Sequence, residues 1–241
     1  MNIRQLVDRV LFALSVPKCT CCRSKLDYGD KGLCRECSAV FKDFRTRNCS
    51  RCAKILNRCS CSSEFLSAHY VRKVVKCYRY LDRNEAAPGN SLIYSLKRDN
   101  RSDVLDACAD LLCDAISNSV NNPSECIFIN IPRRKSAIIK YGIDHSQLLS
   151  REVARRFKAR YIPLLASRAK RAQKSLESTD RFKNAQFYIT RNVDLSNKRV
   201  IIIDDVITTG ASIGKAASLV RSLGCKDITA ATLSIAYKDN Y

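Results

Sequence analysis

The stretch Val200-Ile-Ile-Ile-Asp-Asp-Val-Ile-Thr-Thr-Gly-Ala-Ser212 decides the fold of this 241-residue chain. Its first four residues are all β-branched, which is typical of a strand buried on both faces of a parallel sheet. Two acidic residues follow, then a loop of small residues, and then a helical pattern over residues 212–223 that stops before Gly224. The segment therefore predicts a buried strand that delivers two carboxylates at its carboxyl end, and a loop that turns directly into a helix N-terminus.

The chain beyond residue 65 alternates between apolar runs and helical stretches. Strands are expected at residues 77–81, 126–131, 200–203 and 228–236, and helices at residues 88–97, 104–116, 146–160 and 212–223. Such alternation predicts an α/β fold with a parallel sheet flanked by helices, in which ligands bind at the carboxyl ends of the strands. Hydrophobic residues make up 46% of the chain, which is enough to bury a sizeable core.

The acidic pair and the loop behind it have the chemistry of a sugar-phosphate site. Backbone N–H groups of the loop and the helix dipole suit a phosphate dianion, and Gly210 lets the backbone approach a ligand closely. Asp204 and Asp205 can accept hydrogen bonds from vicinal sugar hydroxyls or hold Mg²⁺ through water. The alternative, two acids that merely cap a turn, fits the thirteen-residue context poorly. Further hydroxyl donors come from Thr208, Thr209 and Ser212.

Nine of the 14 cysteines fall between Cys19 and Cys61, and eight of them form close pairs. Two C-x-x-C turns can direct four thiolates at one zinc ion in a closed tetrahedron, so four pairs predict one or two structural zinc sites. Cys21 beside Cys22 leaves the first ligand ambiguous, and the C-x-C spacing of the last pair makes the second site the weaker prediction. Free thiols and an iron–sulfur cluster are the alternatives. The pairs are Cys19 with Cys22, Cys34 with Cys37, Cys49 with Cys52, and Cys59 with Cys61.

The segment of residues 19–61 shows almost no hydrophobic periodicity, so it needs a bound metal in order to fold. We therefore expect residues 1–65 to form an N-terminal helix and a double zinc-ribbon-like domain, and residues 66–241 to form the α/β domain. The N-terminal helix is expected at residues 3–14, where apolar residues recur at helical spacing. This helix is too short to span a bilayer, and docking onto the core of the protein is favoured over membrane contact.

The chain carries 43 Lys and Arg against 23 Asp and Glu, a formal charge of +20. Residues 151–199 alone contain 14 basic and four acidic residues. A field of this sign attracts polyanions such as nucleic acids, nucleotides or anionic lipids, although a basic proteome or a need for solubility would also produce it. No signal peptide opens the sequence, so we expect a cytoplasmic protein whose thiols stay reduced.

The acidic pair and the T-T-G loop resemble the signature of type I phosphoribosyltransferases, in which this segment binds phosphoribosyl pyrophosphate. The resemblance implies that Asp204 and Asp205 hold the ribose hydroxyls and form the catalytic pair. In that family a loop after an earlier strand binds the pyrophosphate together with Mg²⁺, and Arg133 and Arg134 stand in the matching segment, residues 131–135. Basic residues after a strand are also common in solvated turns. The residues that the resemblance places around the 5′-phosphate are Thr208, Thr209, Gly210, Ala211 and Ser212.

The combination of paired cysteines with such a domain resembles the ComF family of competence proteins, also called double zinc ribbon phosphoribosyltransferase-like proteins. The resemblance extends over nearly the whole chain and includes Ser95-Leu96-Lys97, which looks like the L-K segment of the family. The chain departs from the family at Tyr141-Gly142-Ile143-Asp144, where R-G-F-N is usual, so any role of that arginine is not carried over. Spaced elements similar to those of the family are Arg168, Gln173, Arg181, Asn184 and Phe187.

The resemblance implies a cytoplasmic protein of natural transformation that handles single-stranded DNA. It also implies a DNA-uptake helicase or another competence protein as a partner, because the sequence has no Walker A loop of its own to drive translocation. Residues 70–80 interleave aromatic and basic side chains best, although such tyrosines are more often half-buried strand residues. The residues concerned are Tyr70, Tyr78 and Tyr80 with Arg72, Lys73, Lys76 and Arg79.

Two functions remain open from the sequence. In the first, a competence protein binds phosphoribosyl pyrophosphate as a sensor or acts on an unknown acceptor, while its basic surface binds DNA. In the second, a metabolic phosphoribosyltransferase joins a base or an amine to ribose 5-phosphate. Eight zinc-type cysteines and a charge of +20 favour the first. His69 and His145 are expected to be ordinary structural or surface residues. Small core residues are expected at Cys77, Cys108, Cys113, Cys126 and Cys225.

Overall fold

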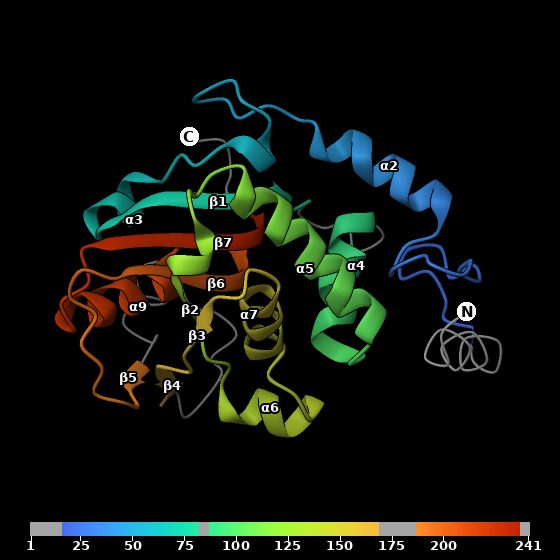
Figure 1. Cartoon of the computed structure of the whole chain (residues 1–241). Coiled ribbons are helices and arrows are strands. Elements are labelled where there is room, and N and C mark those ends of the chain that lie inside the picture. The colour runs from blue at the N-terminus through green and yellow to red at the C-terminus, as the bar shows by residue number, and fades with distance from the viewer. Residues whose placement is uncertain (1–15, 82–86, 169–186, 237–241) are drawn as a thin grey trace.

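A five-stranded parallel sheet forms the centre of the structure, a computed structural model that describes residues 16–81, 87–168 and 187–236 (Figure 1). The strand order is β1-β7-β6-β2-β3, and every neighbouring pair runs parallel. The expected α/β fold with a parallel sheet is therefore confirmed. The strands are β1 (Val71–Arg79), β2 (Ile127–Asn130), β3 (Arg160–Tyr161), β6 (Arg199–Ile207) and β7 (Asp227–Ile235).

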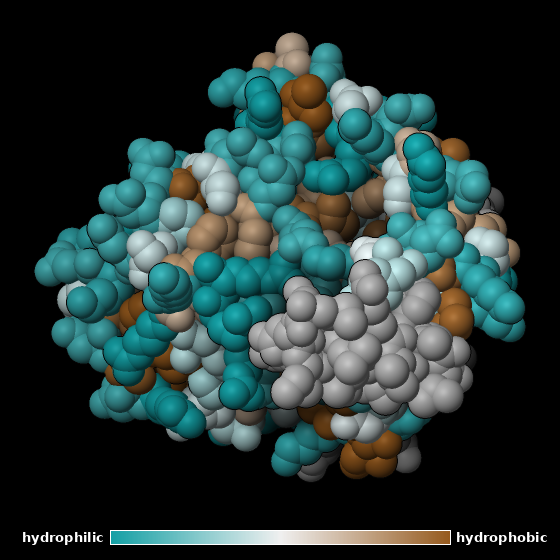
Figure 2. Space-filling model, turned by 45° about the vertical axis from the view of Figure 1, so that its right-hand side comes forward, coloured by the Kyte–Doolittle hydropathy of each residue, from teal (hydrophilic) through white to brown (hydrophobic). Residues whose placement is uncertain are grey.

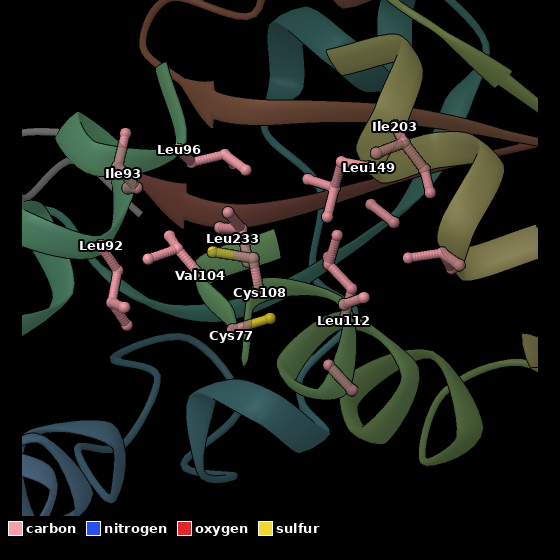
Figure 3. Packing of buried hydrophobic residues seen from close by; sticks show 14 of the residues in the cluster. Cys77, Leu92, Ile93, Leu96, Val104, Cys108, Leu112, Leu149, Ile203 and Leu233 are labelled. Atoms are coloured by element: carbon pink, nitrogen blue, oxygen red, sulfur yellow. The ribbon is translucent and has the colours of Figure 1, made fainter. Parts of the chain in front are cut away.

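Helices cover both faces of the sheet, and successive buried residues of β6 pack against opposite faces. Ile201 and Ile203 pack in one hydrophobic cluster, and Val200 and Ile202 pack in another, because successive side chains of a strand point to opposite faces. The first cluster contains residues of α4 (Pro88–Arg98), α5 (Ser102–Ser117) and α7 (His145–Arg156), and Figure 3 shows its side chains. The second contains residues of α3 (Glu64–Ala68) and α9 (Ala211–Ser222).

The remaining elements lie outside this central sheet. Two short strands, β4 (Leu165–Ser167) and β5 (Phe187–Ile189), form an antiparallel pair. The other helices are α2 (Arg35–Arg45) and α6 (Lys135–Tyr141), with single 3₁₀ turns η1 (Leu56–Arg58) and η2 (Pro123–Glu125).

The junction between β6 and α9 agrees with its sequence pattern, except that β6 continues to Ile207, four residues past the predicted end of the strand. The acidic pair lies in the last part of β6, and α9 begins at Ala211 after a short loop. Gly224 has a left-handed φ of +91° directly after the end of α9, which is the backbone conformation that stops a helix and that glycine adopts most easily.

Helix α7 ends at Arg156, four residues before the end that the sequence predicts at residue 160. The N–H of Ala159 donates to the carbonyl of Ala154 at 2.9 Å, and the N–H of Lys158 donates to the carbonyl of Arg155 at 3.1 Å. This is a Schellman ending, in which the residue after the cap is usually glycine. Here Lys158 takes that position with a φ of +53°, so the sequence contains no visible stop signal.

Strand β1 begins at Val71, six residues before the start predicted at residue 77. The exposed pair Arg72 and Lys73 interrupts the apolar pattern, but Val71, Val74 and Val75 are buried. The prediction of a strand was therefore right and its start was wrong, because an edge strand can carry exposed charges near its end.

The cysteine-rich N-terminal region packs on the α/β part of the chain. Leu33 and Phe41 belong to the same hydrophobic cluster as Leu92, and the ring of Phe41 meets the ring of Tyr78 edge-on, with centroids 4.9 Å apart. The predicted domain boundary near residue 65 falls within α3, and the division at that point stays a prediction.

Four of the five cysteines predicted as core residues are buried, and Cys113 is half-buried against the first cluster. The predicted helix at residues 3–14 lies outside the described residues, as do Gln173, Arg181 and Asn184. On the face drawn in Figure 2, hydrophilic residues cover most of the described surface. Within the described ranges, no helix has both the length and the apolar character needed to cross a membrane.

Candidate functional site

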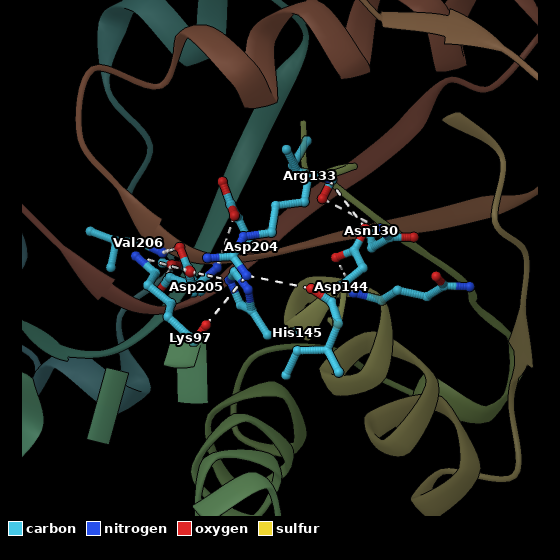
Figure 4. A network of polar contacts seen from close by, with 12 residues as sticks. Lys97, Asn130, Arg133, Asp144, His145, Asp204, Asp205 and Val206 are labelled. Atoms are coloured by element: carbon cyan, nitrogen blue, oxygen red, sulfur yellow. Dashed lines mark hydrogen bonds and ion pairs between the residues drawn. The ribbon is translucent and has the colours of Figure 1, made fainter. Parts of the chain in front are cut away.

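The two acids of β6 lie at the carboxyl edge of the sheet, beside the loop that follows β2. The N–H of Ile131, directly after β2, donates to the carbonyl of Ile203 at 3.0 Å. Asp204 directly follows Ile203, so the acidic pair and the loop after β2 meet at one edge, where parallel sheets bind their ligands. Figure 4 shows Arg133 of that loop together with Asp204 and Asp205.

The carboxylate of Asp205 is held by three donors. Its Oδ2 accepts from Nε2 of His145 at 2.5 Å and lies 3.1 Å from Nζ of Lys97, and its Oδ1 accepts from the N–H of Val206 at 2.6 Å. Burial disfavours the charged form, yet the lysine and the histidine hold the pKa of this carboxyl well below its ordinary value. Asp205 is therefore ionised and paired.

Asp204 has a different environment. Its Oδ1 accepts from the N–H of Asp205 at 2.9 Å, the only hydrogen bond that this carboxylate accepts within the described residues. Burial and the neighbouring charge of Asp205 raise the pKa of Asp204 well above its ordinary value. Asp204 is half-buried, so one of its oxygens can still meet a ligand.

The loop between β6 and α9 places small polar residues around a helix N-terminus. Gly210 has a φ of +78°, and a Cβ at this position would lie 3.0 Å from the side chain of Leu66. The left-handed φ favours glycine here, and the close side chain of Leu66 leaves little room for any other residue. The N–H of Ala211 donates weakly to Oγ1 of Thr209 at 3.4 Å, while Thr208 is exposed. The first N–H groups of α9 have no partner in the helix, so an anion can bind there.

The two arginines after β2 are half-buried. Nη1 of Arg133 donates to the carbonyls of Lys97 and Ile143, at 3.3 and 3.4 Å, and its guanidinium lies 4.9 Å from the ring centroid of Tyr141. Within the described residues both side-chain hydrogen bonds of Arg133 use Nη1, so Nε and Nη2 can serve a ligand. Arg134 occupies the N-cap position of α6, where its side chain makes no capping hydrogen bond.

The segment that departs from the R-G-F-N pattern has a structural role here. Gly142 ends α6 with a φ of +73°. Asp144 caps α7, because its Oδ1 accepts from the N–H of Gln147 at 3.1 Å, and its Oδ2 accepts from the N–H of Arg133 at 3.3 Å. The departure therefore fixes the loop after β2 to the start of α7.

The eight paired cysteines form two groups of four, as the spacing predicts. Within each group all sulfur atoms lie within 4.8 Å of one another. The first group contains Cys22 and not Cys21, which favours Cys22 as the ligand. The groups are Cys19, Cys22, Cys34 and Cys37, and Cys49, Cys52, Cys59 and Cys61.

The first turn of each group repeats the same backbone geometry. The N–H of Arg23 donates to the carbonyl of Cys19, and the N–H of Ala53 donates to the carbonyl of Cys49. Both donors have a left-handed φ, +67° and +56°. In each group this turn places its two sulfur atoms within 4.8 Å of the other two. A closed ZnS₄ tetrahedron with bonds of about 2.3 Å separates its sulfurs by roughly 3.8 Å, so both groups fit a structural zinc ion.

A buried lysine lies beside the second group. Lys76 of β1 is 3% exposed, and its Nζ donates to the carbonyl of Cys61 at 2.7 Å. A buried ammonium needs a nearby negative charge, and four thiolates around Zn²⁺ carry a net charge of −2. The position of Lys76 therefore favours an anionic metal–thiolate cluster over four neutral thiols.

Replacing Lys76 with methionine is expected to weaken zinc binding at the second group about 10-fold, the usual minimum for losing a residue that supports metal ligands. Lys73→Met is the matched control, because Lys73 is exposed on the same strand. Zinc affinity can be measured by competition with a chromogenic chelator. Equal zinc affinities for the two variants would contradict a role of Lys76 as counter-ion.

The chain matches known proteins over both regions. The phosphoribosyl transferase domain family matches residues 145–239. Purine phosphoribosyltransferase from Pyrococcus horikoshii aligns with 54% of this chain and 73% of its own, at 18% identity and a TM-score of 0.38. Competence protein F of Haemophilus influenzae is 26% identical over 222 residues, 88% of this chain and 93% of that protein. DNA utilization protein YhgH of Escherichia coli O6:H1 is 25% identical over 224 residues, 89% and 96% of the two chains. The chain thus resembles these competence and DNA utilization proteins of the ComF family over nearly its whole length, at 25–26% identity.

Two residues of the aromatic and basic stretch at residues 70–80 are buried and unavailable to DNA. Tyr78 is 1% exposed and donates to the carbonyl of Gly89, and Lys76 is buried beside the second cysteine group. Tyr70 remains exposed, with the guanidinium of Arg221 3.8 Å from its ring centroid. The proposed stacking surface is therefore wrong for Tyr78 and Lys76.

Part of the charge surplus of residues 151–199 also has a structural use. Arg156 pairs with Asp106 and Asp110 of α5 and with Glu152 on its own helix. Arg155 pairs with Glu152 as well. Arg156 therefore ties α7 to α5, and Arg155 pairs within α7, so these two arginines contribute less to a binding surface than their number indicates.

The role of His145 was not predicted from the sequence. This histidine was expected to be an ordinary structural or surface residue, yet it is 4% exposed and donates to one of the two site acids. A histidine at the first position of a helix gives no such signal, because its partner is 60 residues away in the chain.

Proposed function

We propose that this protein belongs to the ComF family and acts in DNA uptake, binding phosphoribosyl pyrophosphate with Mg²⁺ through its phosphoribosyltransferase-like domain and single-stranded DNA through a basic surface. One observation carries the first half of the proposal. The end of β6 carries the acidic pair, and within eight residues it is followed by Gly210 with its left-handed φ and by the N-terminus of α9. Sugar hydroxyls and a phosphate need this combination of acceptors and backbone donors.

In this proposal the loop of residues 208–212 surrounds the 5′-phosphate. The acidic pair faces the ribose, while the guanidinium groups of Arg133 and Arg134 take the pyrophosphate. Mg²⁺ would neutralise part of the pyrophosphate charge and make it a better leaving group. The zinc ions of the two cysteine groups have a structural role only, because four protein ligands leave no open position.

A pyrophosphate-release assay separates this function from a metabolic phosphoribosyltransferase. We expect the protein to bind phosphoribosyl pyrophosphate without releasing pyrophosphate when nucleobases or simple amines are added. We also expect loss of the protein to lower the frequency of transformation in a naturally competent host. Steady release of pyrophosphate with one nucleobase, and unchanged transformation, would favour the metabolic function instead.

Binding of single-stranded DNA is expected to be electrostatic and independent of sequence. If about four phosphates are neutralised, affinity falls roughly 50-fold between about 50 and 200 mM salt. Fluorescence anisotropy with labelled oligothymidine measures this dependence. A peptide nucleic acid of the same sequence is the matched control, because its backbone is neutral and it should not bind. Salt-independent binding, or equal binding of the two oligomers, would contradict the proposal.

A further inference from the structure

The two acids of the pair lie on opposite faces of β6. Asp205 shares its strand face with Ile201 and Ile203, which pack in the cluster that contains residues of α4 and α7. Asp204 shares its face with Val200 and Ile202, which pack in the cluster that contains residues of α9. Asp204 is therefore on the side of the loop that leads into α9, and Asp205 is on the other side.

The partners of Asp205 come from the elements on that other side. Lys97 stands in the last turn of α4, and His145 is the first residue of α7. Both contact the same carboxylate oxygen, and the side chain of Asp205 is only 10% exposed. In Figure 4, Lys97 and His145 converge on Asp205. This leaves Asp205 little capacity to accept hydrogen bonds from a sugar.

His145 is fixed in place more firmly than an ordinary surface histidine. It is 4% exposed, and its Nδ1 has no partner within the described residues. Its contact with Asp205 is therefore the only hydrogen bond of its ring there. A buried ring with one unsatisfied nitrogen is not an efficient way to stabilise a fold, which points to a role at the acid that it contacts.

The negative charge of the ligand explains why Asp205 needs a counter-ion. Phosphoribosyl pyrophosphate is a polyanion, and two uncompensated carboxylates would repel it. The ammonium of Lys97 offsets the charge of Asp205 at 3.1 Å, and Asp204 stays available at the edge. The carbonyl of Lys97 also accepts from Arg133, so the same lysine links the acid to the loop after β2.

We infer that the two acids have different roles. Asp204 accepts hydrogen bonds from the sugar hydroxyls, and Asp205 is a positioning residue that Lys97 and His145 hold on the opposite face of β6. This inference rests on the proposed function, because it assigns roles within the same sugar-phosphate site. Lys97 and His145 thereby become residues of the site, acting through Asp205 and not on the ligand.

Calorimetric titration with phosphoribosyl pyrophosphate and Mg²⁺ tests the division. Asp204→Asn is expected to weaken binding about 100-fold, as for the loss of two hydrogen bonds between its carboxyl group and the sugar hydroxyls, and Asp205→Asn about 10-fold or less. Lys97→Met leaves a buried carboxylate without its counter-ion and is expected to weaken binding about 10-fold.

The double variant Lys97→Met with Asp205→Asn is the decisive measurement. If Lys97 acts through Asp205, removing the carboxylate as well restores most of the affinity lost in Lys97→Met. A lysine that contacts the ligand itself gives no such recovery, and thermal unfolding of Lys97→Met shows whether its loss of affinity is only a loss of folded protein. Equal losses for the two aspartate variants, or no recovery in the double variant, would overturn the inference while leaving the proposed function in place. If the unchanged protein binds no phosphoribosyl pyrophosphate, the proposed function fails, and the inference fails with it.

Discussion

Replacing Cys34 with serine is expected to lower the zinc content from two ions per chain to one and to unfold the segment around the first cysteine group. Three thiolates cannot complete the tetrahedron, and binding of a structural zinc ion contributes about 10 to 16 kcal/mol to folding in small zinc domains. Cys34 is also the N-cap residue of α2, and the neighbouring Leu33 packs in the main hydrophobic cluster. Loss of the metal should therefore expose part of that cluster.

Cys21→Ser is the matched control for this prediction. Cys21 stands next to a ligand but belongs to neither group of four, so this variant should keep two zinc ions. Elemental analysis gives the zinc content, and thermal unfolding followed by circular dichroism gives the stability. Loss of one ion in Cys21→Ser, or two ions retained in Cys34→Ser, would contradict the assignment of the first group.

Replacing both site acids, Asp204→Asn with Asp205→Asn, is expected to weaken binding of phosphoribosyl pyrophosphate at least about 100-fold. A hydrogen bond between a sugar hydroxyl and a carboxylate contributes about 1.5 to 3 kcal/mol to binding. The loss of two such bonds therefore lowers the affinity at least about 100-fold. The asparagine side chains keep the shape of the site, and their amides can still hydrogen-bond.

Asp227→Asn is the control for the double variant, because Asp227 is an exposed acid at the opposite, amino-terminal end of the neighbouring strand β7. It removes a similar charge without touching the site. Calorimetry in the presence of Mg²⁺ compares the two proteins. If both bind the ligand as tightly as the unchanged chain, the acidic pair is not the sugar site.

The features that the sequence predicted correctly depend on short segments. The strand and helix around Gly210 follow from a β-branched run, a glycine that must adopt a left-handed φ, and a second glycine that ends the helix. The cysteine groups follow from the spacing of the pairs, because each C-x-x-C turn forms locally. Only the choice of which two turns combine depends on the tertiary structure. Local chemistry specifies these elements, so one sequence suffices to find them.

The features that the sequence did not reveal depend on contacts between distant segments. The site contacts of Asp205 come from Lys97 and His145, on two helices that only the folded sheet brings together. The burial of Tyr78 and Lys76 arises from packing against the N-terminal region, which the pattern of β1 does not encode. No local signal distinguishes these residues from ordinary strand or surface residues.

A crystal structure of the protein with phosphoribosyl pyrophosphate and Mg²⁺ tests the central claim most directly. We predict that the ribose hydroxyls lie within hydrogen-bond distance of Asp204 and that the 5′-phosphate accepts from the backbone N–H groups of residues 208–212. The ligand bound elsewhere, with this loop and the edge of β6 free of density, would contradict the account.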